Sequence, residues 1–453
     1  MPGRMEFKIA LPRAGDTQAP LRDSGSPMRL LVLGDFSGKP AAERTPLAGR
    51  PTLRLDIDSL DTVIARLRPT LKLEAGEIDF EQLDDFHPDA LYSRLDLFKA
   101  LREARAKPPA TGGDLLGSLL GKPAAAAPAA PAATPPAGID AFVQRIVAPH
   151  IVTDNAEQTR NYVAAVDAAI AEQMRKLLHA PAFQSLESAW RGVQWLIQSL
   201  ELDDDLQLHI LDVTRDELLA DVIGAQGKLA ETGLHHALAD RWRNVPGGQG
   251  WSLLAGLYGF GPGDTDVGLL AALGIIASQA GGPFIARGEE ALASAPSAGW
   301  QALRGSEAAP WIGLATPRVL MRLPYGKGSD PIAAFAFEEM PGTPEHEGFL
   351  WGNPALAVTL LIGRSFTAAG GWDFEPGGES EIGDLPAFTF LQDGERELQA
   401  CAEQYLGEQG GNALLAAGLM PVLSHRHANA VTVMRMQSVA EPAEPLAALS
   451  VPG

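Results

Sequence analysis

Alternating and periodic apolar positions divide the first hundred residues into strands and helices. The run MRLLVLGDFSG (28–38) is mostly apolar up to a Gly turn, which predicts a buried strand. The run TLRLDID (52–58) alternates apolar and charged residues, as is typical of a half-buried strand. Apolar residues three or four apart then predict two amphipathic helices, the second beginning at Pro88. Their stripes are Leu60, Val63, Ile64 and Leu67 in the first helix, and Leu91, Leu95, Phe98 and Leu101 in the second.

The chain beyond residue 139 begins with helices and then alternates strands with helices. Periodicity predicts helices over about 139–148, 155–179 and 182–199. Thr214 and Glu217 have the spacing of a capping box that begins a further helix. The predicted strands are LQLHILDV (206–213), WSLLAGLYGF (251–260), PFIA (283–286) and WIGLATPR (311–318). Strand–helix–strand order favours a partly parallel sheet with covering helices, so the predicted fold class is mixed α/β.

One sharp change of composition separates the two parts. Residues 107–138 are mainly Ala, Pro and Gly, which cannot bury a core or sustain a helix, so they form a predicted linker. The predicted organisation is a small domain over 1–106, this linker, a larger domain over 139–438 and a tail over 439–453. The tail has the composition of a disordered segment.

Charge and cysteine content exclude several classes of protein. The net charge of −20 argues against general nucleic-acid binding, because phosphate contacts require an excess of Lys and Arg. Cys401 is the only cysteine, so no disulfide forms within the chain, which fits a reducing cytoplasm. The N-terminus lacks a signal-peptide pattern, and no uninterrupted apolar run reaches about 18 residues. We therefore expect a cytoplasmic chain without membrane insertion.

One glycine-rich segment lies where a phosphate-binding loop would be found. GFGPGD (259–264) follows a predicted strand and precedes a predicted helix. It lacks the third Gly of the dinucleotide motif and the Lys-Ser/Thr pair of a P-loop. A strand-to-helix turn that needs positive φ is the simpler interpretation, and a nucleotide-binding enzyme is the weaker alternative.

Two histidine pairs are the nearest approach to metal ligands. They are His235–His236 in a helix-like stretch and His425–His427 on one face of a predicted strand. A metal site needs three or four converging ligands, and Cys401 is the only thiol. We therefore predict no metal-binding residues.

The remaining acidic pairs do not indicate catalysis. Asp84–Asp85 and Glu338–Glu339 are typical of solvated faces or loop caps. The sequence contains neither a G-x-S-x-G nor an H-E-x-x-H motif. We predict no catalytic and no cofactor-binding residues.

The helix over 182–199 carries one continuous apolar stripe, which predicts that it packs in a core. Glu187 and Arg191 are four residues apart and are expected to pair on its flank. Gly192 lets another part of the backbone come close. The stripe consists of Phe183, Leu186, Trp190, Val193 and Ile197.

The order of these segments resembles a known family. LLHAPAFQSLESAWRGVQWLI resembles the signature helix of the large subunit of the type VI secretion contractile sheath. The likeness covers about residues 139–438, through LHILDVTRDELLADV, WSLLAGLYGFGPGDTDVGLLAALGIIASQAGGPFIA and GLMPVLSHRHANAVTVMRMQS. Residues 5–105 resemble the small sheath subunit, through LLVLGDFSG, LRLDIDSLDTVIARLRPTL and IDFEQLDDFHPDALYSRLDLFKALREAR.

This resemblance implies a fusion of the two sheath subunits, with a small domain packed on a larger sheet domain. It implies a structural role without catalysis or cofactors, because sheath heterodimers stack into a contractile tube around an inner tube. Contraction of that tube drives a spike through a target membrane. The implied partners are other sheath subunits and the baseplate and inner-tube proteins.

Two departures from the family pattern leave the precise role open. The family's large subunit continues past MQS with strands that interlock neighbouring protomers, whereas this sequence ends in a short Pro-rich tail. The segment that docks the recycling unfoldase is replaced by the linker, which leaves binding of the unfoldase open. A bulk sheath protomer and an accessory that initiates, caps or regulates the sheath both remain possible. One assembly arm is predicted in MEFKIAL (5–11), where Phe7, Ile9 and Leu11 share one face of a strand that can add to a neighbour's sheet.

Overall fold

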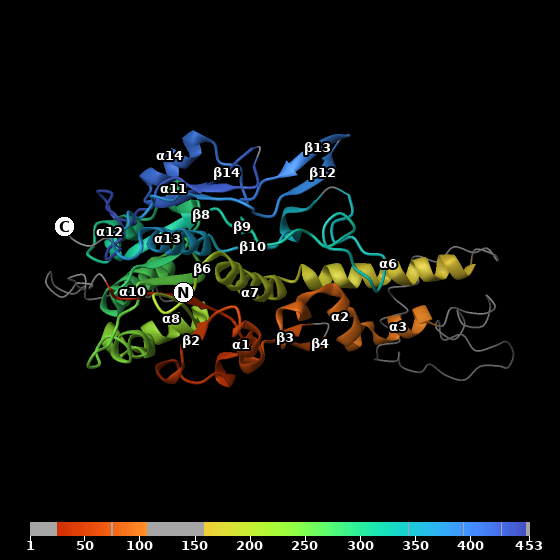
Figure 1. The fold of residues 1–453 in the computed structure, drawn as a ribbon, viewed down its shortest axis with the longest axis horizontal. Helices are drawn as coiled ribbons and strands as arrows, with labels where there is room; N and C mark the ends of the chain where they lie inside the picture. Colours follow the sequence, from red (N-terminus) through yellow and green to blue (C-terminus); the bar gives the residue numbers. More distant parts are fainter. Residues whose placement is uncertain are drawn as a thin grey trace, which may run out of the picture. The chain divides into compact units, whose positions relative to one another are not determined.

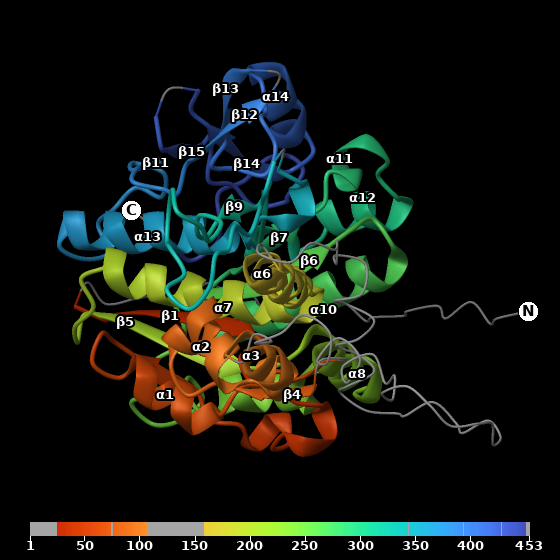
Figure 2. The same cartoon turned by 90° about the vertical axis from the view of Figure 1, so that its right-hand side faces the viewer.

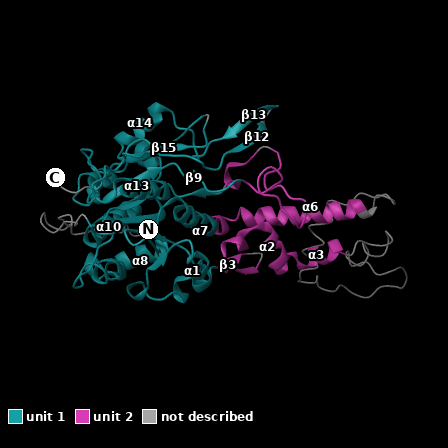
Figure 3. Ribbon diagram, in the orientation of Figure 1, with its two compact units in different colours: residues 1–69, 185–323, 350–453 teal, residues 70–184, 324–349 magenta. Residues whose placement is uncertain are grey.

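The computed structural model describes most of the chain in two compact units, which Figure 3 colours separately. The described residues are 25–73, 76–106, 158–342, 344–392, 394–426 and 428–449. The first unit comprises residues 1–69, 185–323 and 350–453, and the second comprises residues 70–184 and 324–349. Each unit therefore combines segments from before and after the predicted linker, because strands and helices far apart in sequence pack together. The predicted linker lies within residues 107–157, outside the described residues.

A nine-stranded sheet forms the centre of the first unit (Figures 1 and 2). Six neighbouring strands are parallel, and the strands at both edges pair in the antiparallel sense. In spatial order the strands are β11 (Glu381–Ile382), β15 (Val431–Val433), β14 (Leu419–Ser424), β8 (Ile312–Thr316), β7 (Phe284–Gly288), β6 (Leu253–Phe260), β1 (Met28–Gly34), β5 (Leu206–Asp212) and β2 (Leu53–Leu55). This confirms the predicted mixed fold with a partly parallel sheet, and most of the strands prove to be parallel.

Helices cover both faces of this sheet, which explains why the central strands are apolar at consecutive positions. One face packs against α10 (Asp264–Ala280), and residues of α8 (Arg215–Gly224) belong to the same buried cluster. Helix α13 (Ala355–Ala369) contacts β1, β6 and β7 but contributes no described residue to that cluster, so it covers the other face. Helix α7 (Pro181–Ser199) packs on α13, where Gly192 lies against the side chain of Leu356. Gly192 thus makes room for the Leu356 side chain, whereas the sequence analysis had predicted the close approach of another backbone segment.

The predicted capping box begins α8. The Thr214 hydroxyl accepts a hydrogen bond from the Glu217 amide at 3.1 Å, and the Glu217 carboxylate accepts one from the Thr214 amide at 3.0 Å. These bonds satisfy amide groups that have no partner inside the helix. The local sequence pattern was sufficient to predict this element.

Replacement of Thr214 by Ala is expected to lower the free energy of unfolding by about 1 kcal/mol, because the helix loses its side-chain cap. Chemical denaturation of the purified protein measures the change. Thr214→Ser keeps the hydroxyl and is expected to retain most of the stability. An equal loss in both variants would contradict a capping role.

The second unit gathers a hairpin, several short helices and one long helix, shown in magenta in Figure 3. Its aromatic core contains Phe80, Phe86 and Phe183, whose ring centroids lie 4.1 to 6.0 Å apart. The elements are β3 (Thr70–Leu73), β4 (Gly76–Asp79), α2 (Pro88–Arg94), α3 (Lys99–Ala106) and α6 (Gln158–Leu178). Arg105 of α3 pairs with Asp167 of α6 at 2.6 Å, so this unit also joins residues from both sides of the predicted linker.

The second predicted helix of the N-terminal part is interrupted in the structure. Helix α2 ends at Arg94, Leu95 adopts an extended backbone (φ −76°, ψ 133°), and α3 begins at Lys99 after a short 3-10 turn at Asp96–Phe98. The Arg102 side chain donates hydrogen bonds to the carbonyl oxygens of Tyr92 and Leu95 near this break. The prediction of one continuous helix was wrong, and the Arg102 side chain, ten residues from Tyr92 and seven from Leu95, supplies these carbonyl groups with partners.

The segment after residue 438 differs from its predicted disorder. Val439, Leu446 and Leu449 are buried. The amide of Val439 donates to the carbonyl of Ile312 at 2.9 Å, and the amide of Ala447 donates to that of Pro310 at 2.9 Å. Three apolar side chains and these bonds hold residues 439–449 against the rest of the first unit despite their Pro-rich composition. Residues 450–453 lie outside the described residues.

Candidate functional site

One interior strand of the sheet, β1, comes from the small N-terminal part of the chain. Strand β1 pairs with β5 along its whole length, from Met28 opposite Leu206 to Gly34 opposite Asp212. On its other side, β1 pairs with β6 over four positions. All seven residues of β1 are buried. Residues 28–34 are therefore enclosed between strands that come from beyond the predicted linker, and we call this arrangement the strand junction.

A buried arginine holds the carboxyl ends of β1 and β5 together. The Arg44 side chain is only 2% exposed and donates to Asp35 at 2.6 Å and to Asp212 at 2.9 Å. Asp212 also accepts hydrogen bonds from the amides of Phe36 and Ser37 at 2.8 and 3.1 Å. Burial alone would lower the pKa of Arg44, but the surrounding carboxylates raise it above its usual value. The arginine therefore remains charged and bridges the two strand ends.

A second arginine extends this network to helix α8. Arg50 donates to both carboxylate oxygens of Glu217, at 2.7 and 3.2 Å, and to the carbonyl of Asp212 at 2.6 Å. Burial works to raise the pKa of Glu217, but the bonds from Arg50 and from the Thr214 amide lower it overall. The capping residue of α8 is thus also an ion-pair partner of the N-terminal part, which the local sequence pattern did not indicate.

Helix α7 reaches the same junction through Trp190. The Trp190 indole donates a hydrogen bond to the Phe36 carbonyl at 3.0 Å, and the two rings meet edge to face at 5.1 Å. The structure buries every member of the predicted stripe: Phe183, Leu186, Trp190, Val193 and Ile197.

The expected pair of Glu187 and Arg191 forms at 2.7 Å, but Glu187 is fully buried rather than on an exposed flank. Arg322, 135 residues later, donates to the same carboxylate at 2.8 and 3.2 Å. Burial works to raise the pKa of Glu187, while the two arginines lower it overall. No spacing rule relates Arg322 to Glu187, so sequence reasoning missed this partner.

The glycine-rich segment forms a turn whose polar groups bond within the protein. Strand β6 ends at Phe260, and the Gly261 amide donates to Asp266 at 2.7 Å. Asp266 also pairs with Arg215. Gly259, Gly261 and Gly263, all within the described residues, do not have positive φ, so the predicted conformational reason is wrong. A Cβ would lie 2.5 Å from the Arg287 side chain at Gly259 and 2.7 Å from the Glu289 carboxylate at Gly261, and both are ends of flexible side chains that can shift.

Apart from His235 and His236, the remaining candidate residues do not converge on a reactive centre within the described part of the chain. His425 contacts the Thr432 hydroxyl at 2.7 Å, and His427 lies outside the described residues. Cys401 is buried, and burial raises the pKa of its thiol. Phe7, Ile9 and Leu11 of the predicted arm also lie outside the described residues.

The acidic pairs take structural positions. Asp85 caps the 3-10 turn at Leu83–Phe86, accepting from the Glu81 amide at 2.7 Å, while Asp84 is exposed. Glu338 is exposed, whereas Glu339 is buried and accepts from the Tyr325 amide at 2.7 Å.

Within the described ranges, no helix is both long and apolar enough to cross a bilayer.

Two family models match the chain in succession. The model for the EvpB/VC_A0108 tail sheath N-terminal domain (VipB) matches residues 160–297 and 289–440. The model described as type VI secretion system, VipA, VC_A0107 or Hcp2, matches residues 20–125.

Two curated relatives of Pseudomonas aeruginosa agree with this division. The chain is 31% identical over 317 residues to the type VI secretion system sheath protein TssC1, which covers 65% of this chain and 64% of that protein. It is 32% identical over 92 residues to the type VI secretion system sheath protein TssB1, covering 18% of this chain and 54% of that protein. The chain therefore spans less than two thirds of the length of each relative.

Proposed function

The chain belongs to the tail sheath family of type VI secretion systems, and from this membership we propose that it is a structural sheath component that supplies small and large subunits in one polypeptide. The strand junction is the observation that carries this proposal. Strand β1 (Met28–Gly34) falls in the part matched by the VipA model, and its neighbours β5 and β6 fall in the part matched by the VipB model. One chain thus contains a sheet built from both kinds of subunit.

A fused chain fixes the ratio of the two subunits at one to one and removes the need for them to meet by diffusion. Residues 1–106 and 139–438 correspond in this proposal to the two subunits, with residues 107–138 as the connecting linker. The chain contributes contacts for assembly and contraction and performs no enzymatic reaction.

The partners in this proposal are other sheath subunits, together with the baseplate and inner-tube proteins of the apparatus. The assembly arm is the segment MEFKIAL (5–11), whose alternation places Phe7, Ile9 and Leu11 on one face. An extended segment of this kind adds to the exposed edge of a neighbour's sheet through main-chain hydrogen bonds, while alternate side chains fill pockets. Glu6 and Lys8 lie on the opposite face of the same predicted strand.

Negative-stain electron microscopy of the purified protein, alone and mixed with sheath subunits from the same cell, tests this function. We expect the protein to enter sheath-like tubes, because the fused pair retains a complete shared sheet. Tubes formed by the protein alone would identify a bulk protomer. Discrete particles that bind only to tube ends would identify an accessory that initiates or caps the sheath. A protein that neither polymerises nor associates with sheath would contradict the proposal.

Two double variants distinguish a role of the arm in sheath association from an effect on folding. The double variant Phe7→Ser with Ile9→Ser is expected to reduce association with sheath in a sedimentation assay. The double variant Glu6→Ser with Lys8→Ser alters the opposite face and serves as the control. Both variants should keep the melting temperature of the unmodified protein.

A further inference from the structure

A short π-helical turn in the first unit brings two imidazoles and a carboxylate together. Helix α9 (Gly233–His235) continues into a π-helical turn over His236–Asp240. The Thr232 hydroxyl caps the segment by accepting from the His235 amide at 3.1 Å. The Arg241 amide donates to the His236 carbonyl, five residues back, at 3.3 Å. Such π turns are rare and occur frequently at functional sites.

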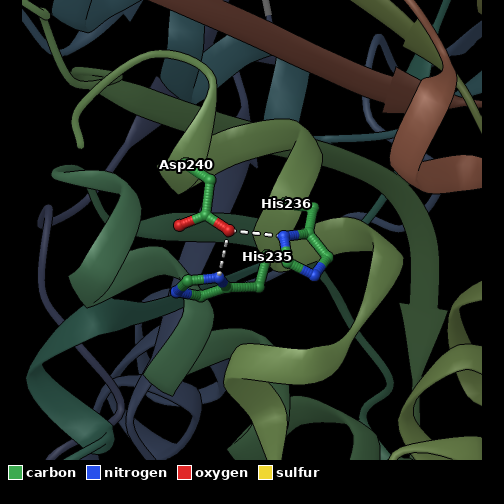
Figure 4. Close-up of side chains that lie close together, drawn as sticks. All are labelled: His235, His236 and Asp240. Carbon is green, nitrogen blue, oxygen red and sulfur yellow. Dashed lines mark hydrogen bonds and ion pairs between the residues drawn. The ribbon is translucent and has the colours of Figure 1, made fainter. Parts of the chain in front are cut away.

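The π turn determines which side chains meet. In an α-helix, residues five apart point about 140° away from each other, so His235 and Asp240 would face different directions. The wider turn carries Asp240 back over both histidines, as Figure 4 shows. The Nδ1 atoms of His235 and His236 both approach Oδ2 of Asp240, and the three candidate ligand atoms lie within 4.8 Å of one another.

One of these nitrogen atoms is left without a hydrogen bond. His235 is buried, and its Nδ1 lies 3.6 Å from Oδ2 of Asp240, beyond hydrogen-bonding distance. This buried nitrogen has no hydrogen-bond partner among the described residues. A buried polar atom of this kind is costly unless something binds it. His236, by contrast, is hydrogen-bonded to the same oxygen.

The carboxylate is held so that one oxygen faces the two rings. The Asn244 side chain donates to the other oxygen of Asp240, Oδ1, at 2.8 Å. Hydrogen bonds of this kind orient the ligating carboxylates of metal sites. Asp240 and His236 are partly exposed, which leaves a path for an ion and for water.

We propose that Nδ1 of His235, Nδ1 of His236 and Oδ2 of Asp240 bind one divalent transition-metal ion of the Zn²⁺ class. Two imidazole nitrogens with one carboxylate oxygen form a donor set that suits Zn²⁺ and its neighbours, and water completes a tetrahedral site. The ion replaces the hydrogen bond between Nδ1 of His236 and Oδ2 of Asp240, and the His236 ring then carries its proton on Nε2 instead. The same ion supplies the missing partner for Nδ1 of His235. The sequence analysis indicated only the two histidines, although Asp240 stands four residues after His236, the spacing of neighbours on a helix. The π turn that brings Asp240 toward His235 as well has no spacing signal.

Calorimetric titration of the untagged, metal-free full-length protein with ZnCl₂ tests this site. We expect one saturable ion per chain. Asp240→Asn and His236→Gln, both at partly exposed positions, are each expected to weaken binding at least about tenfold, since even second-shell changes cost that much at metal sites. His346→Gln removes an exposed histidine elsewhere and is the matched control. It should bind Zn²⁺ as the unmodified protein does.

Two further measurements distinguish a folding defect from the loss of the metal site. Thermal unfolding without metal should give similar melting temperatures for all four proteins, and added Zn²⁺ should raise that of the unmodified protein and the control only. Titration with Co²⁺ should produce visible absorption of a tetrahedral centre, which Asp240→Asn removes. Absence of saturable binding would overturn the proposal. So would unchanged affinity in both site variants, which would place the ion on other histidines.

Discussion

Residues 1–106 and residues 139–453, expressed as separate chains, are expected to fold only when they are produced together. Either part alone lacks half of the strand junction. Without β1, the paired edges of β5 and β6 are exposed, and exposed edges of this kind promote aggregation. Without residues 139–453, β1 loses its paired strands β5 and β6 at both edges and the helices α10 and α13 that cover its two faces.

The size of this effect follows from the buried side chains. Five large apolar residues of β1 are buried, and each stabilises the fold by about 1.5–3 kcal/mol. Their sum is about 10 kcal/mol, comparable to the whole stability of a typical domain. These residues are Met28, Leu30, Leu31, Val32 and Leu33. Loss of soluble protein, rather than a partial loss of stability, is therefore the expected result for each part alone.

Gel filtration after co-expression and after single expression measures this dependence. A protease site placed within residues 107–138 of the full chain gives a matched control, because cleavage there breaks the connection after folding is complete. The two fragments should then co-elute. Fragments that separate under native conditions, or a soluble 139–453 chain with the same melting temperature as the full protein, would refute the shared sheet.

Trp190→Ala is expected to lower the free energy of unfolding by about 3–5 kcal/mol. The ring is fully buried, so its removal leaves a cavity beside Phe36. The change also removes the hydrogen bond from the indole to the Phe36 carbonyl and leaves that carbonyl short of a partner. Chemical denaturation, with the protein at a fixed concentration, measures the loss.

A more conservative substitution distinguishes the stability lost through the cavity from the stability lost with the hydrogen bond. Trp190→Phe keeps an aromatic ring but removes the indole N–H, so it should be less destabilising than Trp190→Ala. A Trp190→Ala protein that retains its melting temperature but loses association with sheath would show that Trp190 acts in partner binding instead of in the core.

Local patterns in the sequence predicted the elements whose stabilising contacts lie within a few residues. The capping box of Thr214 and Glu217 was found from a spacing of three, and the buried strand at 28–34 from its apolar run. Where a distant group intervened, the prediction failed. The helix predicted across Leu95 is interrupted, and Arg102 bonds to the carbonyl groups of Tyr92 and Leu95 beside the break.

The order of strands in the sheet is the clearest property that the sequence alone left undetermined. The change of composition separates residues 1–106 from residues 139–438. In the folded chain, however, β1 from the first part lies between β5 and β6 from the second. The burial of Glu187 with Arg322 has the same origin. Periodicity reports which side of an element faces an apolar environment, because that depends on neighbouring residues along the chain. It does not report which distant element provides that environment, because that choice depends on packing and hydrogen bonding among groups that only the folded chain brings together.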